Sequence, residues 1–275
     1  MINALSFDLE YWYSAELVRH HLQRSRDDQI VEATMPILNL LDKYQTKATF
    51  FVLGLVANNY PELIRDIFNH GHEIACHGYS HKTLHELGPV GFEDEIEKSV
   101  DLLQSITGVR PFGFRAPSFS VDNSTKWAFA ILKKYGFQYD SSIFPARTML
   151  YGVPKAPLHP YKLCLDDIVK EGSDGDLVEF PVTIIKLGIR LPIAGGFYFR
   201  TLPFWFIKLA IERVNRQRPA IIYIHPWEIY PSTPRLGDLP ILSRFVTYYG
   251  INSALGKLEK LVKIFKFKSI GELLQ

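Results

Sequence analysis

Two carboxylates and two imidazoles have the residue types and spacing of a metal site. Asp8 and Glu10 lie two residues apart at the end of an apolar run, so in a strand both side chains point to the same side. His77 and His81 lie four residues apart after another β-prone run, where one helical turn or a tight loop would bring both rings to one ion. Alone, such a histidine pair is common in solvated positions, and this one lacks the glutamate of the zinc-protease signature. Together with the two carboxylates, it favours a divalent metal site.

Three further residues have side chains suited to acid–base chemistry beside such an ion. Arg115 lies in a Phe-Arg-Ala-Pro segment, where its guanidinium could hold a carboxylate in a fixed geometry. His225 follows the strongly apolar run 220–224 and should stand at the mouth of a rigid strand. Asp140 ends another strand, where it could orient a histidine or cap the following turn. At this point a surface arginine and a core histidine bonded to backbone remain open alternatives for Arg115 and His225.

Alternating β-prone and helical segments must position these residues. The β-prone runs end at residues 7, 53, 76, 114, 139 and 224, and candidate residues directly follow five of them. Helical patterns lie between them, at about 31–44, 61–69, 92–106, 125–135 and 203–216. This alternation predicts a parallel α/β fold with its active site at the carboxyl ends of the strands. We expect one domain over 1–275, with an insertion or cap at about 145–200 and a C-terminal extension at about 226–275.

Composition and charge restrict the surroundings in which the chain would work. The 275 residues are 47% hydrophobic, which fits one large domain, and a net charge of +2 gives no general reason to expect a nucleic-acid partner. The two cysteines are too few for a disulfide framework. Acidic residues at positions 8 and 10 interrupt any secretory leader, so a cytoplasmic location is expected.

A basic, apolar tail raises the possibility of peripheral association with the inner membrane surface. Lysines alternate there with apolar residues, and an aromatic segment lies at 204–206. A helix packed on the fold with a solvated lysine face is the competing interpretation. The tail residues concerned are Lys257, Lys260, Lys263, Lys266 and Lys268, beside Leu258, Leu261, Val262, Ile264 and Phe265.

In their order and spacing, these residues resemble the polysaccharide deacetylase family, also called the NodB-homology fold or carbohydrate esterase family 4. One departure is that Leu9 separates Asp8 from Glu10, whereas the common family form has adjacent aspartates. The matching segments are Ser6-Phe7-Asp8, residues 47–54, 71–81 and 114–117, and Ile224-His225. Segments 139–145, 195–200 and 225–228 are similar to a bacterial subgroup found with exopolysaccharide and cell-surface glycan synthesis.

The resemblance implies a distorted (β/α) barrel of about seven strands and a hydrolytic site. Glu10, His77 and His81 would hold a divalent metal, with zinc expected and cobalt, nickel, iron or manganese also suited to these ligands. Asp8 would be the general base, oriented by Arg115. His225 would protonate the leaving nitrogen, and the backbone N–H of Ser118 would help to stabilise the oxyanion. Tyr223, which replaces a usual leucine beside the acyl pocket, Trp227 and Asp140 complete the expected substrate-binding set.

The implied reaction is hydrolysis of an N-acyl amide, with acetyl expected, on an amino sugar carried as a sugar nucleotide or a lipid-linked saccharide. Alternatives are a sugar N-deformylase, a metal-free cyclic amidase of the allantoinase type and a catalytically inactive glycan-binding module. A non-heme iron oxygenase with the same ligand triad is disfavoured, because Asp8 and His225 would then have no role.

Overall fold

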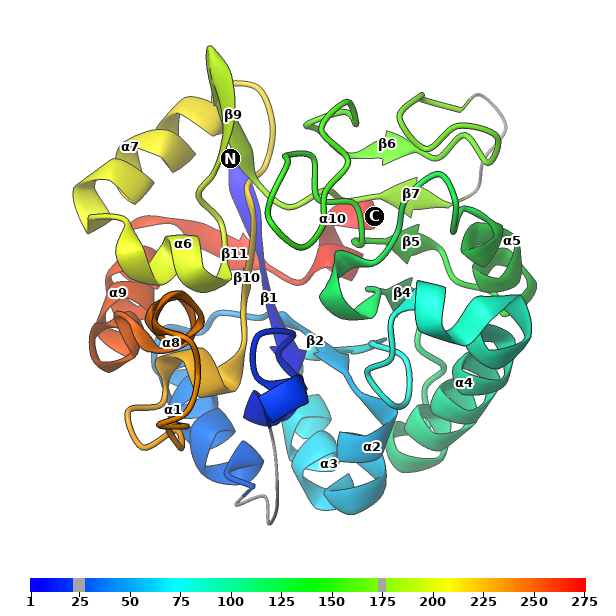
Figure 1. The fold of residues 1–275 in the computed structure, drawn as a ribbon, viewed down its shortest axis with the longest axis horizontal. Coiled ribbons are helices and arrows are strands. Elements are labelled where there is room, and N and C mark those ends of the chain that lie inside the picture. The colour runs from blue at the N-terminus through cyan, green and yellow to red at the C-terminus, as the bar shows by residue number, and fades with distance from the viewer. Residues whose placement is uncertain (22–27, 173–176) are drawn as a thin grey trace.

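A curled sheet of mostly parallel strands forms the centre of the molecule (Figure 1). The computed structural model describes residues 1–21, 28–172 and 177–275. Within these residues the sheet has nine strands in the order β10-β1-β2-β3-β4-β5-β7-β6, and β11 also pairs with β1. The strands are β1 (Ile2–Leu9), β2 (Thr49–Val52), β3 (Glu73–Cys76), β4 (Gly113–Phe114), β5 (Tyr139–Asp140), β6 (Tyr161–Lys162), β7 (Val178–Glu179), β10 (Ile221–Ile224) and β11 (Lys266–Lys268). The predicted parallel α/β barrel is confirmed, in the form of an open half-barrel.

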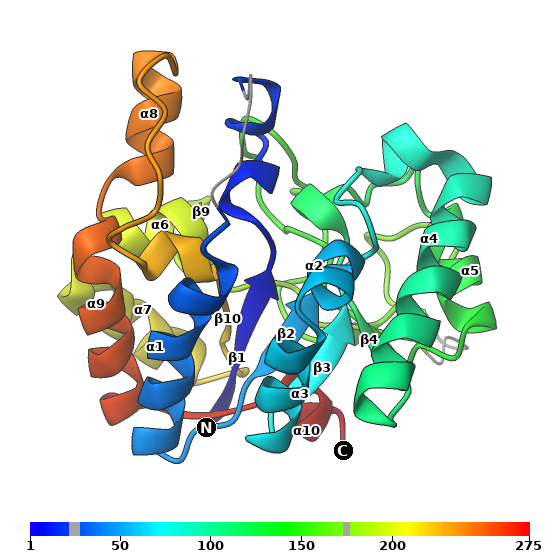
Figure 2. The ribbon, with the colours of Figure 1, turned by 90° about the horizontal axis from the view of Figure 1, so that it is seen from below.

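Helices cover the outside of this sheet, and the main apolar core lies between the two layers (Figure 2). The helices of the described residues are α1 (Ile30–Lys43), α2 (Gly54–Asn59), α3 (Pro61–Asn69), α4 (Leu84–Thr107), α5 (Trp127–Lys134), α6 (Gly196–Thr201), α7 (Phe204–Val214), α8 (Ile241–Tyr248), α9 (Ile251–Ile264) and α10 (Ile270–Leu274), of which α10 packs on the opposite face of the sheet, against Ala4 and Phe51. The sequence predicted the bounds of α3 and β3 but missed α2. It also placed the start of α4 at residue 92, because Gly88 (φ 62°) and Pro89 break the helical pattern after the Thr83 capping box.

Part of the segment predicted as an insertion lies in the wall of the barrel. β7 pairs in parallel with β5, and the Thr183 N–H donates to the Ile221 C=O (3.1 Å), which brings this segment beside β10. The hairpin of β8 (Ile184–Leu187) and β9 (Ile189–Pro192) forms a separate two-stranded sheet. The sequence misled here because these strands are very short and are interrupted by prolines and glycines, so they carry little periodicity.

The C-terminal segment packs on the barrel. Leu258 and Leu261 of α9 are buried in the core, and Nζ of Lys257 donates to the backbone C=O groups of Arg200 (2.6 Å) and Leu202 (2.8 Å). Most of the apolar face of the basic tail is therefore packed on the barrel, as the competing interpretation expected, whereas Ile264 stays 47% exposed. Among the helices of the described ranges, none is both long and apolar enough to cross a bilayer.

Candidate metal centre and active site

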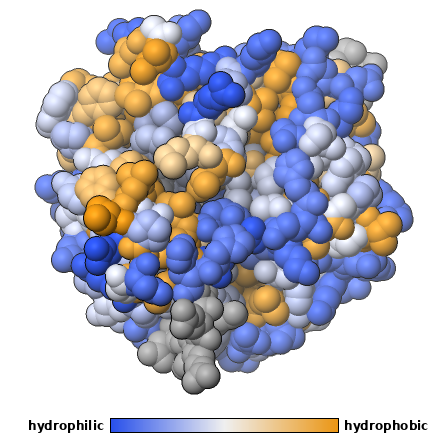
Figure 3. Space-filling model, in the orientation of Figure 1, coloured by the Kyte–Doolittle hydropathy of each residue, from blue (hydrophilic) through white to orange (hydrophobic). Residues whose placement is uncertain are grey.

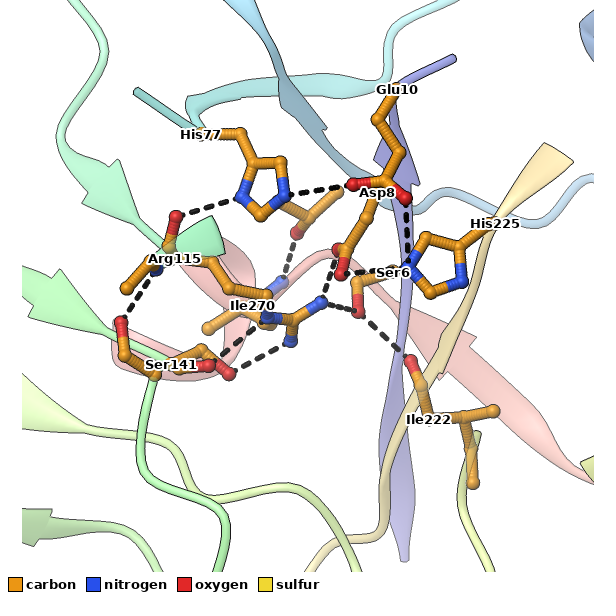
Figure 4. A network of polar contacts seen from close by, with 12 residues as sticks. Ser6, Asp8, Glu10, His77, Arg115, Ser141, Ile222, His225 and Ile270 are labelled. Atoms are coloured by element: carbon orange, nitrogen blue, oxygen red, sulfur yellow. Dashed lines mark hydrogen bonds and ion pairs between the residues drawn. The ribbon is translucent and has the colours of Figure 1, made fainter. Parts of the chain in front are cut away.

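The two N-terminal carboxylates lie at the carboxyl end of β1, between β10 and β2. β1 pairs in parallel with β2 on residues 6–9 and with β10 on residues 4–7, so its end is held firmly in place. Asp8 and Glu10 are both buried, and the Glu10 N–H donates to the Asp8 C=O (3.1 Å). Their side chains reach the same space, as Figure 4 shows. This is the shared orientation that their spacing predicted.

Glu10, His77 and His81 form the candidate metal cluster. Each offers one ligand atom, and these atoms lie within 4.8 Å of one another. Oε2 of Glu10 lies 3.5 Å from Nε2 of His77 and contacts Nε2 of His81. A divalent ion bonded at about 2.0–2.2 Å would bring its ligand atoms to similar separations. All three side chains are buried, and they line one side of a cavity.

The loop after β3 holds the two histidines in ligand geometry. Nδ1 of His77 donates to the Arg115 C=O (2.8 Å), which leaves the Nε2 lone pair directed at the cluster. His81 has φ +65°, a left-handed conformation that residues other than glycine seldom adopt. Oε2 of Glu95 accepts the N–H groups of Tyr79 (3.0 Å) and Ser80 (3.2 Å), and so fixes the loop between the histidines. The donor set therefore fits a small divalent ion.

Asp8 is held by Arg115 and not by the histidine cluster. Nη1 of Arg115 donates to Oδ1 of Asp8 (2.5 Å) and to Oγ of Ser6 (3.0 Å). Its Nε and Nη2 donate to the backbone C=O (3.0 Å) and to Oγ (2.8 Å) of Ser141. The guanidinium is fully buried and stacks over the ring of Phe51 at 4.1 Å. The interpretation of Arg115 as a surface residue is wrong, because the side chain is fully buried. Its bonds to Ser6 and Ser141 hold the guanidinium in place, and Nη1 binds the Asp8 carboxylate.

His225 stands across the cavity from the cluster, at the end of β10. Its Nε2 lies 3.8 Å from Oδ2 of Asp8 and 3.5 Å from Oε1 of Glu10 (Figure 4). Its Nδ1 lies 2.7 Å from Oε2 of Glu228, whose other oxygen accepts from Nε of Arg200 (3.0 Å). Glu228 and Arg200 were missed as site residues. The signal was present in the His225-Pro226-Trp227-Glu228 segment, since a glutamate three residues after a helix cap turns back toward it.

Electrostatics favour a charged pair across this cavity. Burial alone would lower the pKa of His225, but the carboxylates of Glu10 and Glu228 raise it to about 9. Burial alone would raise the pKa of Glu10, but His81 and His225 hold it well below its usual range. The surrounding carboxylates therefore favour the protonated form of His225.

The remaining predicted residues divide between the cavity and its wall. Ser118, Tyr223 and Trp227 line the same cavity of about 140 Å³ as the cluster, and the Ser118 hydroxyl donates to Oε1 of Glu16 (2.8 Å). Asp140 does not line this cavity. It is fully buried behind it, where it accepts from Oγ (2.5 Å) and N–H (3.1 Å) of Ser142. A direct role of Asp140 in substrate binding is therefore not supported by its position.

The fold and site together define an α/β half-barrel protein with a two-histidine, one-carboxylate cluster at the carboxyl ends of its strands. Residues 23–139 match the polysaccharide deacetylase family model, and residues 141–275 match a domain of unknown function, DUF3473. Residues 23–139 are thus similar to polysaccharide deacetylases. The first match contains His77, His81 and Arg115, whereas Asp8 and Glu10 precede it.

Individual relatives agree with this assignment. A peptidoglycan deacetylase of Helicobacter pylori is 34% identical over 151 residues, which are 53% of this chain and 50% of the relative. A putative polysaccharide deacetylase structure from Mycobacterium smegmatis aligns with a TM-score of 0.60 at 19% identity, over 99% of this chain and 89% of that one. The Puue allantoinase structure aligns at 0.64 with 14% identity, over 98% and 88%. The two solved structures share the fold of this chain. The chain covers only part of the length of its curated relatives, with 34%, 50% and 38% for three of them.

Proposed function

We propose that this chain hydrolyses an N-acyl amide, with acetyl expected, on an amino sugar. The observation that carries the proposal is the separation of roles around one cavity. The buried cluster of Glu10, His77 and His81 offers metal ligands, and Asp8 is held apart from them by Arg115. The deacetylase named among the relatives acts on peptidoglycan, which supports an amino-sugar substrate.

Glu10, His77 and His81 would hold a divalent metal, and zinc suits two imidazoles and one carboxylate best. When bound, such an ion polarises the amide carbonyl and favours the ionised form of water. The chain's own contribution is the orientation of the ligands. The hydrogen bond from His77 to the Arg115 C=O keeps the proton on Nδ1 and leaves Nε2 free as a ligand.

Asp8 and His225 supply the two proton transfers that amide hydrolysis requires. Asp8 takes a proton from the attacking water as the water oxygen bonds to the amide carbon, and Arg115 keeps this carboxylate in place. His225 then donates the proton on Nε2 to the amide nitrogen as the C–N bond breaks, so that the products are a carboxylic acid and an amine. Glu228 holds the ring through Nδ1 during this transfer.

The two main alternatives differ in what they need from this site. A glycan-binding module without activity needs neither a base nor an acid. In this chain, however, Arg115 holds Asp8 and Glu228 holds His225. A metal-free cyclic amidase needs no ligand cluster, although the allantoinase fold is similar. The intact cluster therefore favours the metal-dependent reaction.

We also propose that the substrate is an intermediate of surface polysaccharide synthesis, handled in the cytoplasm or at the inner membrane face as a sugar nucleotide or a lipid-linked saccharide. This extends the resemblance of residues 139–145, 195–200 and 225–228 to the subgroup associated with such pathways.

The proposal is tested by screening N-acyl sugar nucleotides and lipid-linked amino sugars for released acid, with zinc, with cobalt and after metal removal. We expect metal-dependent release of acetate from at least one substrate by the wild type and none by His77→Ala. Release of formate would identify a deformylase. Equal turnover after removal of all metal would contradict the proposed mechanism, and the absence of turnover together with tight glycan binding would support the inactive module.

A further inference from the structure

Helix α8 forms an apolar projection beside the candidate active site. Figure 2 shows that it extends beyond the neighbouring helices, and Figure 3 shows apolar side chains gathered over this part of the surface. Ile241, Leu242, Phe245 and Tyr249 belong to this projection and are 46–80% exposed. Large apolar side chains are seldom gathered in water without a partner.

The same helix contributes to the wall of the catalytic cavity. Val246 and Thr247 of α8 line the cavity that contains Asp8, Glu10 and the histidines. Leu150 lines it as well, and Leu150 and its neighbour Met149 are exposed by 52% and 80%. The cavity is therefore bordered by apolar side chains from two separate segments, and any surface that covers them lies close to its mouth.

The base of the projection is firmly anchored, so its tip is a fixed feature of the fold. Tyr248 is buried in a cluster with Trp227 and Leu239, and its hydroxyl accepts the Leu236 N–H (3.0 Å). The polar flank of the projection is basic. Arg235 and Arg244 are exposed and form no ion pair with any residue that the structure describes, whereas Asp238 is the one acidic residue in 229–250.

We propose that α8 and the Met149–Leu150 segment dock this chain on the surface of an anionic phospholipid bilayer, with the cavity mouth at the level of the headgroups. Apolar side chains flanked by exposed arginines match the chemistry of that surface, in which acyl chains lie beneath anionic headgroups. This surface differs from the basic tail, in which Leu258, Leu261 and Val262 are buried in the core.

A second copy of this chain fits the projection less well. A twofold contact through α8 would bring the exposed arginines of both copies to one interface, which opposes association. A stable protein interface also uses about 20–30 residues on each side, far more than this projection offers. Docking on a bilayer brings no arginines of a second copy together and does not need so many contact residues.

The test is co-sedimentation of the full chain with vesicles of phosphatidylcholine alone and of phosphatidylcholine mixed with phosphatidylglycerol. We expect the wild type to bind the mixed vesicles preferentially. The variant Ile241→Ser, Leu242→Ser, Phe245→Ser should bind them at least about 10-fold more weakly, because its apolar anchor is gone. In the variant Arg235→Gln, Arg244→Gln, the affinity for the mixed vesicles should fall about 5-fold for each arginine, whereas binding to vesicles of phosphatidylcholine alone should not change.

A matched control changes equally exposed apolar residues elsewhere. Trp205→Ser with Leu209→Ser on α7 removes side chains that are 63% and 55% exposed, and it should leave vesicle binding unchanged. Thermal melting is measured for every variant, and a melting temperature equal to that of the wild type would show that the fold is retained. An equal loss of vesicle binding in this control would overturn the proposal, and so would the absence of vesicle binding by the wild type. A concentration-dependent dimer that the α8 variant abolishes, without any vesicle binding, would also overturn it.

The docking proposal deepens the proposed function by selecting substrates presented at a membrane, and the two can fail separately. Hydrolysis of a soluble N-acetyl amino sugar without vesicle binding overturns the docking alone. Vesicle binding without hydrolysis of any N-acyl sugar overturns the proposed activity and supports the docking.

Discussion

Nδ1 of His225 lies 2.7 Å from Oε2 of Glu228, so the opposite nitrogen of the ring faces Asp8 and Glu10. Glu228 is in turn bound by the buried Arg200. The ring is thus fixed at one end and presents its reactive nitrogen at the other. This arrangement fits a proton donor more closely than a fourth metal ligand.

Replacing His225 with alanine should leave metal content intact and lower turnover by roughly 10²–10⁴-fold, the usual contribution of one acid–base group. The reason is that His225 lies outside the cluster of Glu10, His77 and His81. Metal analysis and steady-state kinetics on the same preparation measure both quantities. Full activity, or loss of the metal, would assign His225 another role.

Glu228→Gln should shift the alkaline limb of the rate profile to lower pH. Glu228 contributes to raising the pKa of His225 to about 9, against the opposite effect of burial. In the proposed mechanism the protonated ring is the active form, so activity should be present below this pKa and be lost as pH rises through it. Without the Glu228 charge the pKa falls and the loss begins earlier. An alkaline limb that does not move would show that Glu228 has only a structural role.

The sequence predicted the clustering of the candidate residues better than the bounds of the elements around them. Asp8 and Glu10, His77 and His225 lie at the ends of the apolar strands β1, β3 and β10, so their position at the carboxyl ends of a sheet was predictable. Arg115 follows the two-residue strand β4 and was singled out by its Phe-Arg-Ala-Pro segment instead. Two features were not predictable. The strands of 145–200 are too short to show a period, and the burial of Asp140 depends on the pairing of β5 with β7, which local sequence does not reveal.

Glu179→Gln should make the protein less sensitive to alkaline pH. Glu179 is fully buried beside Asp140 on the neighbouring strand, and burial together with the Asp140 carboxylate raises its pKa well above the usual range. The folded state therefore keeps a proton that the unfolded chain releases, so the stabilising contribution is present at acidic pH and is lost as pH rises. Glutamine cannot ionise, and its amide can still donate to Asp140.

Thermal melting between about pH 5 and pH 9 measures this effect, and the variant should show a flatter decline of the free energy of unfolding than the wild type. The Glu259→Gln variant is the control, because Glu259 forms ion pairs with Lys43 and Lys263 at the surface. Parallel pH profiles for wild type and Glu179→Gln would show that the buried carboxyl pair does not share a proton in the folded state.

The proposed mechanism depends on Glu10 as a metal ligand and on Asp8 as the base. The most direct test measures metal content and activity together in Glu10→Ala and in Asp8→Asn. Glu10→Ala should bind metal poorly and be inactive, because it removes the one carboxylate of the cluster. Asp8→Asn should keep near-stoichiometric metal and lose almost all activity, since Asp8 pairs with Arg115 outside the cluster. If Asp8→Asn loses the metal while Glu10→Ala retains it, the two assignments are reversed.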